Sequence, residues 1–463
     1  MSVTGVFDVG KSALLTYQKA MGVTGHNIAN VHTPGYTRQE AVLSESRPVD
    51  GGPGQVGTGV ELTEIRRQVD QFVEGSLQNS REQLGYFTAA RGGLLQVAGT
   101  LSPSTSLGVS SALNEFFQSI QDVATNPADP AARTVMLSKA NSFAQRMNYT
   151  AVELDRQRVQ VDGDVRKAID QVNALAEKIA GLNQEVSRAE LSGQQANDLR
   201  DQRGRLIGEL AELVEISTIE DQTGQVSVFA GRGQVLVTNN QTFKLVGVPN
   251  SSNGSMVDVR YDGGSGPVTD MTSVIESGRL KGLLELRDQR IPEATKALDD
   301  LASTVVSQVN TVHAAGYGLD GVTGRNLFTA TGTAARDMSV AVTDIRQLAA
   351  SSTVTGVPGN NANALAMANL ETTGMASLGG KTMTGHLSAT ISGIGARAQA
   401  AERDLDAQSI VQEQLEARRA EASGVSLDEE LVNMLQQQRG FQAASKIIMA
   451  ADEMLQTLLN LKR

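Results

Sequence analysis

The side chains that most often carry out catalysis are few and scattered in this sequence. Its four histidines are His26, His32, His313 and His386, and neither an HExxH pattern nor a spacing typical of metal ligands joins them. We interpret His26 and His32, which flank the end of a predicted helix, as surface or cap residues; a pH-sensitive or metal-binding role is the alternative. The sequence also has no GxSxG elbow and no P-loop.

Adjacent carboxylates are the next candidates for acid–base chemistry. Asp299-Asp300 and Glu429-Glu430 lie on predicted helices, where neighbouring side chains diverge by about 100° and cannot share a substrate. Asp320 lies in LDGVTGRN, which imitates a calcium-binding loop but has too few acidic ligands. We therefore predict a protein without catalytic residues, metal ions or cofactors, and not an enzyme.

One glycine-rich pattern has the letters of a nucleotide-binding loop. Residues 52–57, GPGQVG, match the GxGxxG fingerprint of dinucleotide-binding proteins. No buried strand precedes them, the segment that follows is short and β-like rather than helical, and Pro53 occupies the turn. We interpret the match as accidental, within a Gly/Pro-rich connector that spans residues 44–59.

The composition excludes further classes of function. The chain has 463 residues with 40 basic and 51 acidic side chains, and only 3% are aromatic, so we expect no nucleic-acid partner. It has no cysteine, which excludes disulfides and thiolate metal sites. No apolar run approaches the ~20 residues that span a bilayer, and the N-terminus lacks a Sec-type signal pattern. We predict a soluble chain without membrane insertion.

A helical seam with a period of 3.5 is predicted near the start of the chain, over residues 4–30. Its apolar residues repeat every seven positions: Phe7, Leu14, Met21 and Ile28. We expect the helix to end at Asn30, which tolerates the left-handed conformation, because Pro34 disfavours its continuation. Pro34 and Gly35 then predict a type II turn over residues 33–36.

The middle of the chain is predicted to form a long helical body that carries a small β insertion. Helical patterns begin at Ile65 and at Leu113, and a seam with Arg158 as its one charged member runs over residues 147–189, about 65 Å long. Alternating residues predict strands over 218–271, with a hairpin at residues 231–233. Helix follows from 278 to 315 with a break near Pro292, and then an irregular segment with short strands over 316–359.

The chain ends in a second seam of the same period. Ser426 and Glu429 form a predicted capping box after Gly424. The apolar residues that follow repeat by seven: Leu427, Met434, Phe441, Ile448 and Leu455. Seams of this kind usually form the core of a helical bundle within one chain, and for the two terminal seams packing between copies is an equal alternative. The predicted fold is mainly α with a small β insertion, an α+β multidomain arrangement.

Both ends of the chain resemble the axial proteins of the bacterial flagellum, a group of rod, hook and hook-associated proteins. NIANVHTPGYTRQ, which contains Asn27, Asn30, Pro34, Gly35 and Tyr36, is similar to their N-terminal motif, and residues 426–461 resemble their C-terminal segment. Three further stretches resemble the hook-associated branch: residues 36–39, ANDLRDQRGRLIGEL from residue 196, and GNNANALAMANL from residue 359.

The resemblance implies a structural protein that joins hook to filament. It implies three domains: an inner coiled coil (1–62 plus 424–463), a helical rod (63–217 plus 272–423) and an outer β domain (218–271). It further implies self-assembly, contacts with the hook protein and with a second junction protein or the filament, and type III export. A cytoplasmic chaperone would hold the C-terminal helix before the chain is secreted to the flagellum.

Two other functions stay open from the sequence. The first is a hook or distal rod protein of the same group, which would carry more β structure and lack the long central coiled coil. The second is a flagellum-associated peptidoglycan hydrolase, which needs an acid and a second carboxylate that flank a cleft. Helix content tests the first alternative, and an assay of wall lysis tests the second.

Overall fold

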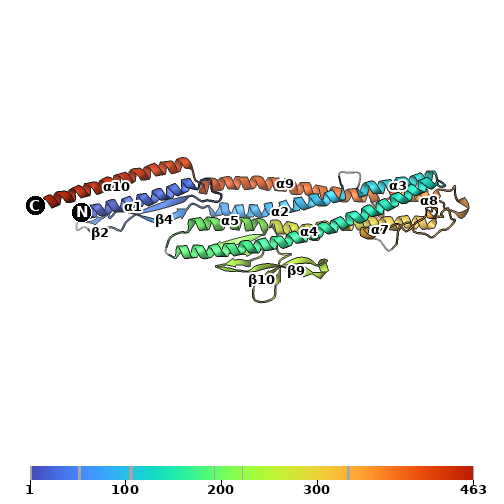
Figure 1. The fold of residues 1–463 in the computed structure, drawn as a ribbon, viewed down its shortest axis with the longest axis horizontal. Helices are drawn as coiled ribbons and strands as arrows, with labels where there is room; N and C mark the ends of the chain where they lie inside the picture. Colours follow the sequence, from blue (N-terminus) through green and yellow to red (C-terminus); the bar gives the residue numbers. More distant parts are fainter. Residues whose placement is uncertain are drawn as a thin grey trace.

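The protein is an elongated rod in which the helices run along the long axis, and its two ends lie together at one tip (Figure 1). The computed structural model describes residues 3–50, 54–103, 108–191, 193–221, 223–330 and 334–461. Helices dominate, and the strands form small separate sheets. The predicted mainly α fold with a small β insertion is confirmed.

The terminal tip is built from α1 (Val3–Ala29) and α10 (Leu427–Leu461), as both seams predicted. Tyr36 N donates to the carbonyl of Thr33 over 3.1 Å and Gly35 has φ of 79°, which confirms the type II turn after α1. Asn30 ends α1 differently from our expectation. Asn239 and Ser255 are the non-glycine residues with positive φ in the described segments, and Asn30 instead bonds the His26 carbonyl through its side chain at 3.0 Å.

The contact between α1 and α10 combines small residues with members of the predicted apolar columns. A Cβ atom at Gly10 would lie 2.8 Å from Ile448 Cγ1, and one at Gly440 would lie 2.6 Å from the Tyr17 ring. Thr24 and Asn27 of α1 bond Gln437 and Glu430 of α10, and the buried residues of the two helices include Gly10, Ala20, Val23, Thr24, Asn27, Ala444 and Ala451. The glycines let the two backbones approach closely, and Ile448 and Tyr17 pack against them.

A β arm follows the turn, where we expected a connector and the start of a helix. It comprises β1 (Gln39–Glu45), β2 (Val49–Asp50), β3 (Gln55–Val56) and β4 (Val60–Arg67), with β1 antiparallel to β4. Ile65 therefore lies on a strand, and α2 (Gln71–Leu101) begins later, capped by Asp70. The fingerprint-like GPGQVG lies here too, but Gly52 and Pro53 fall outside the described residues.

The rod is a bundle around one very long helix, α4 (Pro130–Glu190). Its 61 residues span about 90 Å, and the predicted seam is confirmed because Met147, Leu154, Val165 and Val172 are buried. The other long helices of the rod are α2, α3 (Val109–Thr125), α5 (Asn197–Leu213), α7 (Ile291–Ala315) and α9 (Met383–Ser423), with α8 (Ala362–Ala368) at the far end.

A break before α7 lies where Pro292 predicted one. Helix α6 (Gly278–Glu285) passes into a π-helical segment, Leu286–Arg290, and α7 begins at Ile291 with the proline in its first turn. Beyond α7 the segment 316–359 is irregular, as expected. Its described residues form isolated bridges, Tyr317 with Ser351 and Phe328 with Val340, rather than the short strands that we predicted.

Two small sheets lie on α4, one of four strands and one of three (Figure 1). The predicted hairpin is confirmed, since Ala230 pairs with Gln234. The first sheet has the order β5-β6-β7-β8, and the second has the order β11-β10-β9. The strands are β5 (Ile216–Glu220), β6 (Val226–Ala230), β7 (Gln234–Thr238), β8 (Gln241–Thr242), β9 (Lys244–Asn250), β10 (Met256–Asp262) and β11 (Thr269–Asp270).

Polar side chains on α4 attach these sheets to the rod. Asp162 Oδ1 accepts from Val257 N at 2.8 Å, Asn173 bonds both backbone groups of Leu245, and Asn183 Nδ2 donates to the Val226 carbonyl at 2.8 Å. The three α4 residues are separated by 11 and 10 positions in the sequence. Since about three helical turns bring a side chain back to the same face, they form one polar row that holds strands from both sheets.

A buried histidine fixes the irregular segment at the far end of the rod and predicts sensitivity to acid. His313 Nδ1 lies 2.7 Å from the Arg325 carbonyl, and Nε2 accepts from Ala349 N at 3.1 Å, so the ring is the neutral Nδ1–H tautomer. Burial, together with nearby Arg325 and Arg133, lowers the pKa of His313 below its usual 6.5. The unfolded chain therefore binds this proton first as the pH falls.

We expect the free energy of unfolding to be unaffected by this site above pH 6.5 and to decrease below it. The loss from one histidine is at most about 1.4 kcal/mol per pH unit. Urea unfolding of the native chain and of His313→Gln at several pH values between neutral and mildly acidic checks the prediction. Equal pH dependence in the two chains would contradict it.

Candidate assembly site

Asn27 is the centre of the N-terminal motif and every polar atom of its amide is used. Its Nδ2 donates to the Gln39 carbonyl at 2.8 Å and to Glu430 Oε2 at 3.0 Å. Its Oδ1 accepts from Tyr36 Oη at 2.8 Å and from Gln39 N at 3.0 Å. The side chain is 1% exposed, so it ties α1, the turn, β1 and α10 together in a dry contact.

Glu430 completes this contact from the other end of the chain. It is 2% exposed, and Arg38 Nε donates to its Oε1 at 2.8 Å, while Arg38 Nη1 lies 3.2 Å from Glu429. The predicted capping box gives Glu429 a role and Glu430 none. The bond from Glu429 N to Ser426 Oγ is a long 3.5 Å, so the Ser426 cap is weak, and Glu430 is the carboxylate that contacts the motif.

Tyr36 is held as a hydrogen-bond donor. Burial, followed by the charges of Asp198, Asp201 and Glu430, raises the pKa of its hydroxyl well above the usual range. His26 Nδ1 lies 3.1 Å from the same hydroxyl, and its Nε2 is 3.6 Å from Asp198, so His26 joins the network rather than merely capping a helix. Pro34 is exposed on the turn, and His32 is exposed as expected.

The first turns of helix α5 contact this motif and the strand β4. Asp201 accepts from Thr37 N at 2.8 Å and from Arg67 Nη1 at 2.7 Å, and Asn197 Nδ2 donates to the Ile65 carbonyl at 2.8 Å. Burial raises the pKa of Asp201, although Arg67 opposes the shift. The stretch ANDLRDQRGRLIGEL, noted in the sequence without a role, is thus the helix on which the terminal tip docks.

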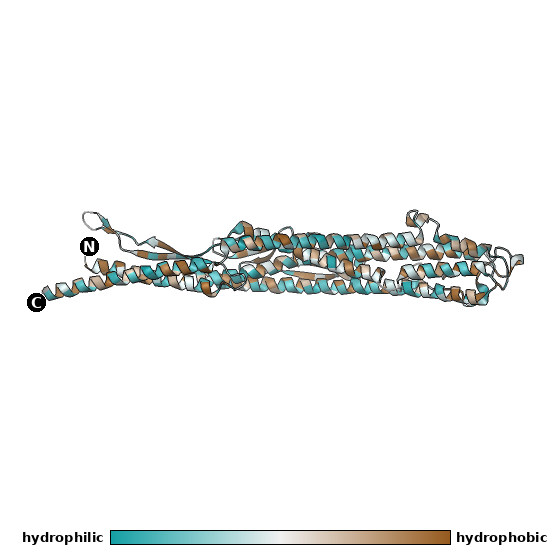
Figure 2. Cartoon of the chain, turned by 90° about the horizontal axis from the view of Figure 1, so that it is seen from above, coloured by the Kyte–Doolittle hydropathy of each residue, from teal (hydrophilic) through white to brown (hydrophobic). Residues whose placement is uncertain are grey.

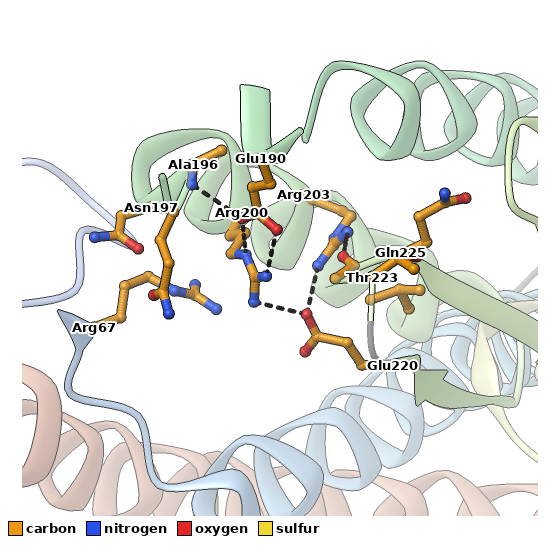
Figure 3. Close-up of polar contacts among 12 residues, drawn as sticks. Arg67, Glu190, Ala196, Asn197, Arg200, Arg203, Glu220, Thr223 and Gln225 are labelled. Carbon is orange, nitrogen blue, oxygen red and sulfur yellow. Dashed lines mark hydrogen bonds and ion pairs between the residues drawn. The ribbon is translucent and has the colours of Figure 1, made fainter. Parts of the chain in front are cut away.

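Another face of the same turns of α5, with Arg200 and Arg203, points toward α4 and the sheets (Figure 3). Arg200 makes a two-point contact with Glu190, at 2.7 and 2.8 Å, and reaches Glu220 at 2.8 Å. Arg203 donates to Asn183 and lies 3.3 Å from Glu220. Burial lowers the pKa of Arg203 to about 10. Burial alone would raise the pKa of Glu190, but the bonds from Arg200 and Ala196 N outweigh it and lower that pKa.

The junction between the tip and the rod is polar and contains open space. Three cavities of about 620, 550 and 190 Å³ lie around the turn, α5 and the start of α2. The larger two border α9 as well, near Arg419. The contacts across this junction are hydrogen bonds and ion pairs, such as Arg38 N to the Ser423 carbonyl at 2.8 Å.

The residues that we predicted as an assembly interface lie on the two helices in contact, and one of them, Ile448, packs against Gly10. Phe7 and Leu427 are 38% and 43% exposed. Seven others are half-buried: Leu14, Met21, Ile28, Met434, Phe441, Ile448 and Leu455. Figure 2 shows apolar residues along both terminal helices.

The sequence analysis missed a further apolar surface on α10. Its members are more exposed than the predicted ones: Leu431 at 51%, Val432 at 63%, Leu435 at 55%, Met449 at 57% and Leu458 at 53%. Exposed apolar residues in this number along one helix indicate a surface that another molecule covers.

The residues considered for chemistry have structural contacts. Asp320 pairs with Arg325 and accepts from Val322 N, while Asp300 pairs with Lys296 on the surface of α7. Within the described ranges no three His, Asp or Glu side chains are placed to hold a metal ion. The same ranges contain no helix long and apolar enough to cross a membrane.

Comparison with known families finds three matches that follow one another along the chain. Residues 94–328 match the model of the flagellar hook-associated protein FlgK helical domain. Residues 7–37 match that of the flagella basal body rod protein, and residues 417–461 match that of the flagellar basal body rod FlgEFG protein C-terminal. The two terminal matches cover most of α1 and α10.

Curated relatives and one solved structure agree with these matches. The chain is 27% identical to flagellar hook-associated protein 1 of Bacillus subtilis, over 98% of this chain and 97% of that one. It is 30% identical to the protein of the same name from Escherichia coli, over 68% of this chain and 58% of that one. The structure of the flagellar hook junction protein FlgK from Burkholderia pseudomallei shares the fold, with a TM-score of 0.67, 18% identity, and coverage of 76% of this chain and all of that one.

Proposed function

The chain belongs to the flagellar hook-associated protein 1 family, and from that premise we propose that it joins the hook of a flagellum to its filament. It acts as a structural part that stacks with its own kind and with its neighbours on either side. One observation carries this proposal: α1 and α10 pack closely at Gly10 and Gly440, yet large apolar side chains of α10 such as Leu431, Val432 and Leu435 stay exposed. Such a pair is complete only when other subunits cover it.

The free energy for assembly comes from this apolar surface. Four or five Leu, Met, Phe or Ile side chains per helix, buried at roughly 25 cal/mol per Å², contribute on the order of 10 kcal/mol. That burial offsets the entropy lost when the two ends of the chain become ordered. Contacts that repeat from one copy to the next are heterologous, and they generate rings or helical stacks.

The proposed roles are assigned to the three domains that we inferred from the sequence. The terminal domain (1–62 plus 424–463) forms the inner assembly surface, the helical rod (63–217 plus 272–423) surrounds it, and the β domain (218–271) faces outward. The sheets are attached to α4 away from the terminal tip, which supports an outward position (Figure 1). The protein acts as a scaffold and carries out no reaction.

Export and chaperoning complete the proposal. The chain reaches the flagellum by type III export in an unfolded state, which the lack of cysteines favours because no disulfide has to be opened. Before export, a cytoplasmic chaperone covers α10, whose exposed leucines would otherwise promote aggregation.

The ends of the free chain are expected to be unfolded part of the time and to become ordered on assembly. Amide exchange should show residues 1–35 and 426–463 unprotected in the monomer and protected in the assembled flagellum. The rod, with α4 at its centre, should be protected in both and serves as the internal reference. Protected terminal helices in the monomer would count against ordering on assembly.

A genetic experiment tests the adaptor role directly. Deletion of the gene should leave hooks without filaments, while monomeric filament protein accumulates outside the cell. Expression of the intact chain should restore filaments. Normal filaments on cells that lack the gene would refute the role.

A further inference from the structure

A cavity of about 620 Å³ lies between the terminal tip and the rod and has positively charged walls. Its lining includes five arginines and three carboxylates: Arg67, Arg81, Arg200, Arg203, Arg419, Glu74, Asp201 and Glu220. Each carboxylate already accepts from an arginine. The walls thus retain an excess of positive charge in a partly enclosed space, where charge interactions are stronger than in bulk water.

Arg81 is the lining arginine whose charge is not matched by a carboxylate of the cavity lining. Arg67, Arg200, Arg203 and Arg419 each have an ion-pair partner. Within the described segments, no hydrogen bond or ion pair of Arg81 occurs, although its side chain is half-buried in the cavity wall. Five N–H donors are therefore available at one place.

The surroundings of Arg81 determine from which side a negative ion approaches. Arg81 also borders the neighbouring cavity of about 550 Å³, which is lined by Glu74, Glu209, Glu212 and Glu416 against three arginines. Those carboxylates repel an anion, so the favourable side is the larger cavity. The positive neighbours Arg200 and Arg67 also contribute to the lowered pKa of Arg203 there, after burial.

A glycine in α5 provides the space for the Arg81 guanidinium. A Cβ atom at Gly208 would lie 1.7 Å from Arg81 Nη1, so any other residue would displace the guanidinium. One turn earlier, Gly204 borders the same cavity with nothing within 4 Å of its Cβ position. Gly208 thus accommodates Arg81 closely, whereas Gly204 does not.

We propose that the larger cavity binds an oxyanion, with Arg81 as its principal ligand. The ligand is a phosphate-like or carboxylate group, either a free ion or an acidic side chain of a second copy of this chain. Because the walls come from β4, α2, α5, β5 and α9, an anion there links the terminal tip to the rod. This inference does not depend on the proposed flagellar role, and the free chain is sufficient to test it.

Calorimetric titration of the full chain with inorganic phosphate, at ionic strength held constant with sodium chloride, is the primary test. We expect saturable binding, and a loss of about 10- to 100-fold in affinity for Arg81→Gln, as for a lost charge-assisted contact. Arg91→Gln is the control, because Arg91 lies on the same helix and pairs with Glu402 outside the cavity. Equal affinity in wild type and Arg81→Gln would overturn the free-ion form.

Substitutions at two glycines of α5 separate an effect on phosphate binding from an effect on folding. Gly208→Ala should weaken phosphate binding because its Cβ displaces the Arg81 guanidinium, and Gly204→Ala should leave binding unchanged because its Cβ meets open space. Equal phosphate affinity in the two alanine variants would show that Arg81 is not the ligand.

Sedimentation velocity identifies the source of the anion. If a second copy supplies a carboxylate, the wild-type chain associates in phosphate-free buffer, and both phosphate and Arg81→Gln reverse the association. If the ligand is a free ion, phosphate binds the monomer and Arg81→Gln leaves association unchanged. The absence of both phosphate binding and Arg81-dependent association would refute the site.

Discussion

Leu435→Asp should abolish assembly and leave the fold of the free chain intact. Leu435 is 55% exposed on α10, beside the equally exposed Leu431, so its replacement removes little packing from the monomer and changes its stability by less than about 0.5 kcal/mol. In the proposed assembly the same position becomes buried, where an unpaired carboxylate costs several kcal/mol. A loss of at least about 100-fold in assembly follows from that cost.

Swarming motility, counts of filament-bearing cells and the thermal unfolding of the purified chain test this prediction together. Gln436→Asp is the matched control, because it adds the same charge at the next exposed position of α10, where the residue is already polar. Substitution at Leu14 or Phe441 is less selective, since both are half-buried beside the α1 and α10 contact. Filaments on cells that carry Leu435→Asp would refute the proposed role of this surface.

Arg287→Met should destabilise the attachment of the β sheets by about 3–5 kcal/mol. Arg287 lies in the π-helical segment and is fully buried; it donates to Asp162 Oδ1 at 2.7 Å, to the Val257 carbonyl at 2.7 Å and to Asp288. Its removal leaves Asp162 buried with less compensation. Urea unfolding and amide exchange over residues 216–270 measure the effect.

Arg166→Met is the control for this substitution. Arg166 contacts the other oxygen of Asp162 at 3.1 Å, but its side chain is 48% exposed, so its loss should cost no more than about 1 kcal/mol. Adding Asp162→Asn to Arg287→Met should cost less than the sum of the two single changes, because the asparagine carries no charge to bury. Additive costs would show that the two side chains do not act as a pair.

Local signals in the sequence predicted the helical body well. The helix end at residues 29–36, the long seam of α4, the turn at Gly231–Gly233 and the irregularity near Pro292 all depend on residues within a few positions of one another. Proline and glycine restrict or extend backbone angles whatever the rest of the chain does. Features of this kind are therefore readable without a structure.

The β arm was predicted wrongly because tertiary contacts decide it. Ile65 and Val69 are four residues apart and so fit a helix, yet the alternating stretch from Val60 to Arg67 pairs with β1. Where α1 and α10 approach most closely, a Cβ atom at Gly10 would meet Ile448 and one at Gly440 would meet the Tyr17 ring. Hydrophobicity alone does not distinguish a contact that is buried within the chain from a surface that another molecule would cover.

The polar contacts of the site join residues far apart in the chain, which no local pattern reports. Asn27 and Glu430 are separated by 403 positions, and Thr37 and Asp201 by 164. One signal was available: Asp162, Asn173 and Asn183 recur at nearly equal spacing on the inner side of α4, where a simple seam would be apolar. Regularly spaced polar residues inside an apolar helix indicate that another element binds there.

The lengthwise arrangement of the helices has a mechanical consequence. Tension applied between the two tips of the rod acts along α2, α4 and α9. Because the force is parallel to the helices, the packed side chains between them have to separate all at once and not one after another. Near residue 424 this overlap ends and ion pairs beside cavities take its place. A molecule pulled apart between the two tips of the rod should therefore unfold first at that boundary, and the long bundle should withstand a greater force.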